Sequence, residues 1–224
     1  MCGRFTLTLD VSDLKDAIGL QEVPEDYQPR FNVAPTQKIA VLTQFPKPQL
    51  EMMRWGLIPS WAKDMAIGNR MINARAETVA EKPAFRKSFA TRRCLILADG
   101  FYEWQRSDGK KGPSQPYYFQ SKANPVFAFA GLWDVWTQPN GDPLHSCTII
   151  TTEANEVVRP VHERMPVILS KERWADWLEA QSTEDLLMML RPLPPEQLDG
   201  IPVNPEVNNP AVDTPLCVQP WGGI

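Results

Sequence analysis

The chain has 224 residues, of which 43% are hydrophobic and 22% are charged, and its formal net charge is −4. This composition is typical of an ordinary soluble globular protein with enough residues to bury a core, and the acidic balance disfavours general binding of nucleic acid. No apolar run approaches membrane-spanning length, and the N-terminus lacks the basic and apolar regions of a signal peptide. We therefore expect a cytoplasmic protein that does not bind membranes.

Alternating and continuous apolar runs predict a chain rich in strands, with short helices between them. The expected strands are 4–9, 38–44, 50–58, 94–98, 101–105, 117–120, 126–133 and 147–152. Helices are expected at 11–20, 73–80, 83–90 and 183–191, and a further one follows Ser170. The first has its expected N-cap near Ser12 or Asp13, and the second has Asn73 as its N-cap. The helix after Ser170 is expected to have Trp174 and Trp177 on one face.

Segments 59–72 and 107–116 are expected to be loops, and the proline-rich end of the chain is expected to be loop-like. No repeat and no sharp change in composition marks a domain boundary. The prediction is therefore a single α+β domain over 1–224, with mostly antiparallel strands, peripheral helices and a helical, acidic, proline-rich part at 170–224.

The cysteine and charge patterns limit which ligands the protein is expected to bind. The four cysteines show no metal-binding spacing and there are two histidines, so we expect neither a metal nor a cofactor, and we expect Cys94 and Cys147 to be buried thiols. Residues 54–93 carry nine Lys or Arg against three acids, a net charge of +6, whereas residues 172–224 have a net charge of −7. A basic segment of this kind fits either a phosphate contact surface or a solvated helical face.

Cys2 follows the initiator methionine, and removal of Met1 would leave a cysteine with two neighbouring nucleophiles. Its α-amine and thiol have reference pKa values of about 7.7–8.0 and 8.5. With an aldehyde, the amine forms an imine and the thiol then closes a thiazolidine ring, helped by effective molarities of roughly 10⁵–10⁸ M. Amide hydrolysis with the amine as base is an alternative. A third interpretation is that Cys2 is simply a buried residue of the first strand.

Four other segments combine polar groups with aromatic or glycine residues: RWGLIPSW at 54–61, NARAE at 73–77, GFYEW at 100–104 and HERMP at 162–166. Each also has a structural interpretation as tryptophan packing, a helix cap, an outward-facing acid or a loop histidine. Together they supply what aldehyde chemistry at Cys2 would need. A carboxyl among aromatic residues has a raised pKa and can transfer protons, histidine is a second acid or base, arginines bind phosphate, and exposed tryptophans stack on bases.

The motifs MCGRF, NVAPTQ, RWGLIPSW, NARAET, CLILADGFYEW and HERMPVIL occur in this order within residues 1–169, and together they resemble the SRAP (SOS response-associated peptidase) family. The resemblance implies an α+β fold with a curved, barrel-like β core. It also implies a DNA–protein crosslinker that protects abasic sites in single-stranded DNA, including single-strand/double-strand junctions, and that works near the nucleoid during DNA damage.

Carried over to this sequence, the resemblance implies that Cys2 forms the thiazolidine, Asn73 contacts the opened deoxyribose, Glu103 shuttles protons and His162 assists ring opening and reversal. The implied or candidate DNA-binding residues are Arg4, Arg75, Trp104, Arg164, Trp61 and Arg86. Without the Cys2 thiol an imine would persist and give a weak abasic-site lyase. A monomer is expected. Two alternatives stay open, which are an N-terminal-nucleophile peptidase that removes Met1 and a non-covalent single-strand-binding module.

Overall fold

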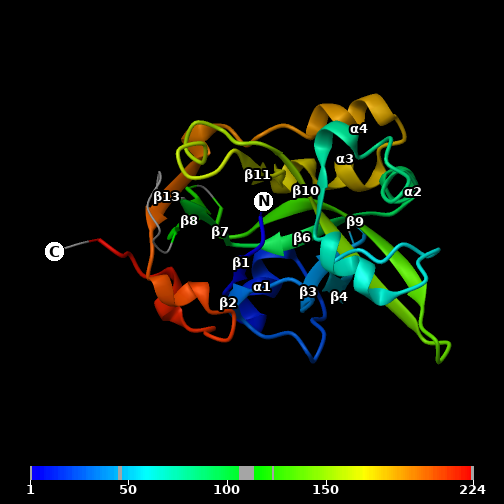
Figure 1. Cartoon of the computed structure of the whole chain (residues 1–224), viewed down its shortest axis with the longest axis horizontal. Coiled ribbons are helices and arrows are strands. Elements are labelled where there is room, and N and C mark those ends of the chain that lie inside the picture. The colour runs from blue at the N-terminus through cyan, green and yellow to red at the C-terminus, as the bar shows by residue number, and fades with distance from the viewer. Residues whose placement is uncertain (1, 45–46, 106–113, 123, 223–224) are drawn as a thin grey trace.

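The strands form two sheets in the part of the chain that this computed structural model describes, which is residues 2–44, 47–105, 114–122 and 124–222 (Figure 1). The larger sheet contains β3 (Lys38–Leu42), β4 (Leu50–Trp55), β5 (Asn73–Arg75), β6 (Arg93–Ala98), β9 (Phe127–Thr137), β10 (Pro143–Glu153), β11 (Arg164–Pro166) and β12 (Ile168–Leu169). The smaller sheet contains β1 (Phe5–Leu7), β2 (Arg30–Val33), β7 (Gly100–Gln105), β8 (Gln115–Ser121) and β13 (Leu198–Pro202).

Five strands of the larger sheet close on themselves. β10 pairs with β4, β4 with β3, β3 with β6, β6 with β9, and β9 pairs again with β10. The β4–β10 pair is parallel and the other four pairs are antiparallel. The expected α+β fold with a largely antiparallel, barrel-like core is confirmed.

The apolar run of β6 is explained by burial of both its faces. Cys94, Ile96 and Ala98 pack in one hydrophobic cluster together with side chains of the smaller sheet. Leu95 and Leu97 pack in a second cluster with side chains of the helices. A strand covered on both sides has no polar face, so its sequence does not alternate. Cys94 and Cys147 are both buried free thiols, as expected.

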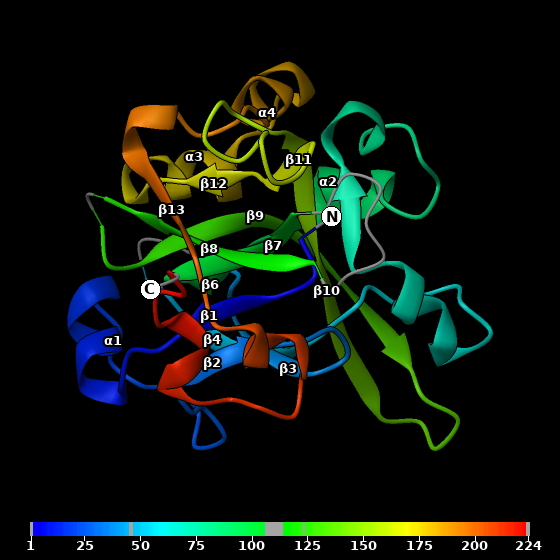
Figure 2. The same ribbon diagram turned by 60° about the vertical axis from the view of Figure 1, so that its left-hand side comes forward.

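The α-helices are α1 (Val11–Ile18), α2 (Arg86–Thr91), α3 (Trp174–Glu179) and α4 (Thr183–Met189). The 3₁₀ helices are η1 (Met65–Arg70), η2 (Ala76–Thr78), η3 (Lys171–Arg173), η4 (Pro195–Gln197), η5 (Pro205–Asn208) and η6 (Pro215–Val218). Figures 1 and 2 show α2, α3 and α4 gathered at one end of the molecule. None of the helices in the described part of the chain is long and apolar enough to cross a membrane.

The N-caps or first residues of three helices differ from expectation by a few residues. The N-cap of α1 is Asp10, whose carboxylate accepts from the Asp13 N–H at 2.9 Å, so the predicted cap at Ser12 or Asp13 is wrong. The helix expected from residue 83 begins at Arg86. After Ser170 a 3₁₀ turn comes first, and α3 follows with Trp174 and Trp177 buried on one face as expected.

The predicted helix at 73–80 is wrong. Asn73–Arg75 is the short strand β5, which runs parallel to β10 with Asn73 opposite Ile149, and only a 3₁₀ turn follows. The Asn73 side chain donates to the Cys2 carbonyl oxygen instead of capping a helix. Pairing with a long buried strand therefore overrides the local preference of asparagine for a helix start.

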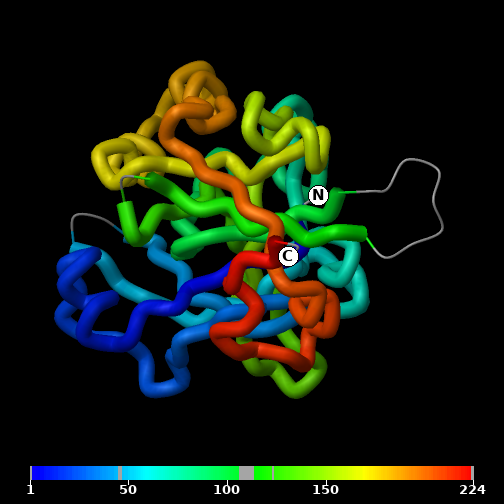
Figure 3. Tube along the Cα trace, turned by 90° about the vertical axis from the view of Figure 1, so that its left-hand side faces the viewer, coloured from blue at the N-terminus to red at the C-terminus, as the bar shows by residue number. Residues whose placement is uncertain are grey.

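The end of the chain is more ordered than a loop. Leu198–Pro202 forms β13, which pairs with β8 along its whole length, so the loop-like tail expected there is wrong. Figure 3 shows this part of the chain, in orange and red, crossing the face that carries β7 and β8. Val203, Val207 and Cys217 are buried there against Tyr102 and Tyr118. Most of the predicted loop at 107–116 lies outside the described residues.

Candidate functional site

Cys2 lies at the entrance to β1 and is fully buried. Its side chain packs in the same cluster as Phe5, Trp55 and Phe129, and its thiol faces the Arg4 carbonyl oxygen at 4.0 Å. Burial and, second, the charge of Glu103 raise the pKa of the Cys2 thiol well above its ordinary value. The thiol therefore carries its proton near neutral pH and needs a base before it can react as a nucleophile.

Glu103 reaches Cys2 because β1 and β7 pair antiparallel. Phe5 lies opposite Phe101, and the Tyr102 N–H donates to the Arg4 carbonyl, so the next residue of β7 falls beside the start of the chain. Glu103 is 2% exposed, and burial raises its pKa to about 7. A carboxyl with that pKa gives and takes protons at neutral pH, as its aromatic neighbours in the sequence predict.

His162 lies in the turn between β10 and β11 and faces Glu103. Its Nε2 is 4.0 Å from a Glu103 carboxylate oxygen. The Arg164 backbone N–H donates to Nδ1 at 3.0 Å, which orients the ring so that Nε2 is the nitrogen that faces the acid. The two side chains thus form an acid–base pair next to the Cys2 backbone.

Asn73 completes this group from the opposite sheet. Its Nδ2 donates to the Cys2 carbonyl oxygen at 2.8 Å, which ties the start of the chain to β5. Its Oδ1 is buried without a hydrogen-bond partner in the described part of the chain. An unsatisfied acceptor in this position can take a hydrogen bond from an amine or from a sugar hydroxyl. The structure therefore brings Cys2, Asn73, Glu103 and His162 together.

The six candidate DNA contacts fall into two neighbouring pairs and two separate exposed residues. Arg4 and Trp104 stack on each other, with the guanidinium carbon 5.6 Å from the ring centre. Arg164 follows His162 by two residues and also lies near Arg75. Thr151 of β10 links the two arginines, because Thr151 pairs with Arg75 and the Thr151 carbonyl accepts a hydrogen bond from Arg164 at 2.7 Å. The remaining two are exposed: Trp61 lies in the 59–72 segment and Arg86 starts α2, with no described contact that joins either to Cys2.

Arg4 is held by residues that the sequence did not single out. Its Nη1 donates to Asn32 Oδ1 at 2.6 Å and to the Val207 carbonyl at 2.8 Å. Fully buried Asn32 also donates to the Val212 carbonyl at 2.6 Å, and the Trp104 indole N–H donates to Asn208. The position of Asn32 in the NVAPTQ motif was a usable signal, but nothing in the composition of the tail pointed to the site.

Trp61 is 60% exposed, yet the segment that carries it is well held. Gly56 has a φ of +124°, and a Cβ there would lie 2.6 Å from the Gly68 carbonyl oxygen. The backbones of 56 and 68 can meet because both residues are glycine. Arg54 adds hydrogen bonds to the Thr36 carbonyl and to Asn69, which ties the 59–72 segment to the end of β4.

Replacing Gly56 with alanine is expected to destabilise the protein by about 3 kcal/mol or more, because it combines a left-handed backbone with a clash against main-chain atoms. Gly141→Ala is the matched control, since Gly141 also has a positive φ of +93° but has open space around its Cβ position. Its expected cost is about 1 kcal/mol. Urea unfolding of both variants measures the difference, and equal costs would show that the close contact with Gly68 is unimportant.

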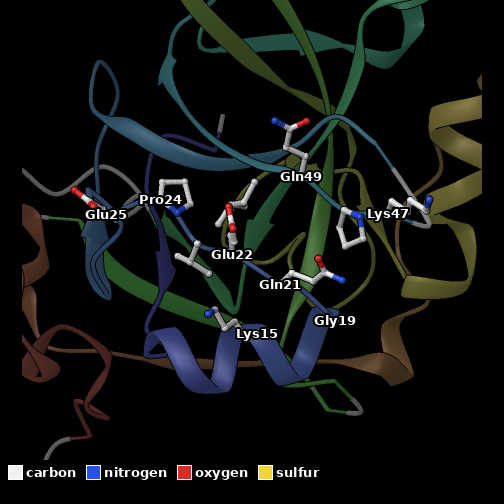
Figure 4. A pocket seen from close by; sticks show the side chains of 11 residues that line it. Lys15, Gly19, Gln21, Glu22, Pro24, Glu25, Lys47 and Gln49 are labelled. Carbon is white, nitrogen blue, oxygen red and sulfur yellow. The ribbon is translucent and has the colours of Figure 1, made fainter.

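An open depression elsewhere shares no residue with this group. Figure 4 shows it between α1 and the region after β3. Its volume is about 960 Å³. Lys15, Lys47, Glu22 and Glu25 line it with glutamines and prolines, so its charges are mixed. In the described part of the chain no group of three or more His, Cys, Asp or Glu side chains is placed to hold a metal ion.

The model of the family described as SOS response associated peptidase (SRAP) matches residues 1–210. The chain belongs to the SRAP family. Among SRAP proteins it is 43% identical over 224 residues to the "Abasic site processing protein YoqW" of Bacillus subtilis, with 98% of this chain and 99% of that protein covered. It is 34% identical to the "Abasic site processing protein HMCES" of Xenopus tropicalis, over 97% of this chain and 78% of that protein.

A crystal structure of a Bacteroides thetaiotaomicron protein shares this SRAP fold, with a TM-score of 0.85 and 26% identity over 98% of this chain and all of that one. The SRAP match begins at residue 1 and so includes Cys2, Asn73, Glu103 and His162. It ends at residue 210, beyond Val207 and Asn208 that hold Arg4 and Trp104. The contacts of Val207 and Asn208 therefore fall inside the SRAP match, whereas the Val212 contact of Asn32 lies just beyond its end.

Proposed function

We propose that this SRAP protein processes abasic sites in single-stranded DNA by forming a covalent thiazolidine between Cys2 and the opened sugar. The observation that carries the proposal is the convergence of Glu103, His162 and Asn73 on Cys2, the residue that would become the N-terminus after loss of Met1. The names of the YoqW and HMCES relatives point to the same substrate class.

The raised pKa of the Cys2 thiol supports an order of steps. The free amine of Cys2 attacks the aldehyde carbon first, because the buried thiol is still protonated. Glu103, with a pKa of about 7, gives a proton to the hydroxyl of the carbinolamine, which leaves as water and yields the imine. The Cys2 sulfur then bonds to the imine carbon, and its proton passes to the ring nitrogen through Glu103. One aldehyde, one amine and one thiol thus become one thiazolidine and one water.

His162 and Asn73 act on the sugar in this scheme. His162, whose Nε2 lies 4.0 Å from Glu103, exchanges a proton with that acid while the sugar ring opens, and in reverse when the crosslink is undone. Asn73 Oδ1 accepts a hydrogen bond from a hydroxyl of the opened deoxyribose. Arg75, Arg86 and Trp61 supply exposed phosphate and base contacts. The stacked pair of Arg4 and Trp104 adds a cationic and aromatic surface on the other face of β1 and β7 from Cys2.

The family description favours one companion activity, peptide-bond cleavage at Met1. Self-cleavage would release the Cys2 amine, and an ordinary aminopeptidase would do the same. We place the protein in the cytoplasm at the nucleoid, as a monomer whose residues 1–224 work as one domain, and we include single-strand/double-strand junctions among its targets. An exposed Trp61 that stacks on a terminal base pair would serve such junctions.

The test is denaturing intact-mass spectrometry after the protein is mixed with a single-stranded oligonucleotide that holds one abasic site. The free protein should lack Met1, and the adduct should weigh protein plus DNA minus one water. Undamaged DNA should give no adduct. A protein without Met1 that gives only free species would overturn the crosslinking proposal and favour the peptidase. Association that denaturant abolishes would favour the non-covalent binding module.

A further inference from the structure

The Arg164 guanidinium is engaged by an acid of the same chain. Nη1 donates to one carboxylate oxygen of Glu77 at 2.6 Å, and Nη2 donates to the other at 3.0 Å. Nη2 also donates to the Thr151 carbonyl at 2.7 Å, which fixes the guanidinium against β10. This two-pronged pairing is the geometry with which arginine binds a phosphate.

Glu77 lies on the surface side of this pair. Its side chain is 51% exposed, whereas that of Arg164 is 13% exposed. Glu77 follows Arg75 by two residues, where β5 passes into a 3₁₀ turn. The hydrogen bond from Arg164, and more weakly the charge of Arg75, lower the pKa of Glu77, so its carboxylate is ionised at neutral pH. The acid thus lies next to two candidate phosphate contacts, Arg75 and Arg164, and is the more exposed partner of its ion pair.

A DNA phosphate that approaches Arg164 meets a negative charge already in place. Either the carboxylate swings into solvent or the two anions share the arginine, and like charges side by side weaken association. Because Arg164 is also anchored by Thr151, its guanidinium stays in position when Glu77 leaves.

We propose that Glu77 is an internal competitor of the DNA backbone, occupying Arg164 in the free protein and yielding to a strand phosphate when DNA binds. The inference rests on the proposed function and adds a control to it. Competition at Arg164 weakens binding to every strand, damaged or not. Residence on DNA is then decided by the covalent bond at an abasic site and not by backbone affinity.

The test is the affinity for undamaged single-stranded DNA, measured by fluorescence anisotropy over a range of salt concentrations. Glu77→Gln keeps the shape of the side chain and one acceptor for Arg164 but removes the charge. We expect it to bind roughly tenfold more tightly. The slope of log affinity against log salt should steepen by about 0.7, the value for one more phosphate neutralised on a single strand.

Glu81→Gln is the matched control, because Glu81 is an exposed acid four residues along the same surface segment. It should change affinity less than twofold and leave the salt slope unchanged. In an Arg164→Ala background, Glu77→Gln should lose its effect, because the competed group is gone. If Glu77→Gln and Glu81→Gln changed the DNA affinity equally, the gain would come from the overall surface charge and the proposal would be overturned.

Weaker binding by Glu77→Gln, in a variant with wild-type thermal stability, would also overturn it and show that Glu77 positions Arg164 for DNA. Covalent capture of an abasic strand is measured in parallel. If the wild type captures the abasic strand and Glu77→Gln binds undamaged DNA with unchanged affinity, the proposed competition by Glu77 is wrong and the crosslinking function still stands. If the wild type neither binds undamaged DNA nor captures an abasic strand, both the proposed function and the proposed competition by Glu77 are wrong.

Discussion

Cys2→Ala protein is expected to form no denaturant-stable adduct with an abasic strand, a loss of at least about 10²-fold in trapped product. The variant keeps the terminal amine, so it still forms the imine, but it has no sulfur to close the ring. The imine hydrolyses back or undergoes β-elimination, and the strand is cut. Denaturing gels that separate adduct, intact strand and cleaved strand measure all three products.

Two further variants sharpen this result. Cys2→Ser can close an oxazolidine, and its adduct should form but decay faster than that of the wild type. Cys94→Ala removes another buried thiol, which lies in β6, and should crosslink normally. If Cys2→Ala gave as much stable adduct as the wild type, another nucleophile would be responsible and the role proposed for the N-terminal cysteine would be wrong.

Glu103→Gln is expected to slow crosslinking by about 10²–10⁴-fold, the usual contribution of a positioned acid or base. The wild-type rate should show an inflection near pH 7, because burial raises the pKa of Glu103 to about 7, and the variant should lack it. Single-turnover rates between pH 5.5 and 8.5 measure both effects. Glu51→Gln is the control, since Glu51 is also paired with a histidine, His145 at 3.0 Å, but in another part of the molecule.

The Glu103→Gln variant is also expected to be more stable than the wild type at pH 8. Between the ordinary carboxyl pKa of 4.5 and the raised pKa of about 7, the folded protein keeps a proton that the unfolded chain has released. The free energy of unfolding therefore falls as pH rises through this window, by about 3 kcal/mol in total, and the loss is complete above pH 7. Glutamine at position 103 has no charge to bury, so the variant should recover much of the free energy of unfolding that the wild type loses. Urea unfolding at pH 5 and pH 8 tests this, and a pH-independent difference between the two proteins would contradict it.

The barrel strands were predictable because long-range packing leaves a local pattern in their sequences. β6 is apolar at every position from Cys94 to Ala98, and β3 and β4 have clear strand patterns. β5 has three residues, too few for any period, and a helix-capping asparagine misled the prediction. β13 contains Asp199 and Gly200 and exists only through its pairing with β8, so no local signal marks it.

The residues around Cys2 were selected mainly through the resemblance to the SRAP family, because each of them taken alone also had a structural interpretation. An acid among aromatic residues, as at Glu103, indicates an altered pKa from its sequence neighbours alone. The partners of the arginines were not predictable, because Val207 acts through a backbone carbonyl that every residue has. The pairing of Arg164 with Glu77 joins residues 87 positions apart, a contact that only the folded sheet creates.

Residues 207–213 hold Arg4, Asn32 and Trp104 by hydrogen bonds that join the two ends of the chain. Translation delivers Cys2 first and these tail residues nearly last. Contacts that span about 200 residues of sequence form late, because a long loop must close before they are made. A chain still on the ribosome, or one that has lost its tail to a protease, therefore has Cys2 but lacks the hydrogen bonds that hold Arg4 and Trp104 in place.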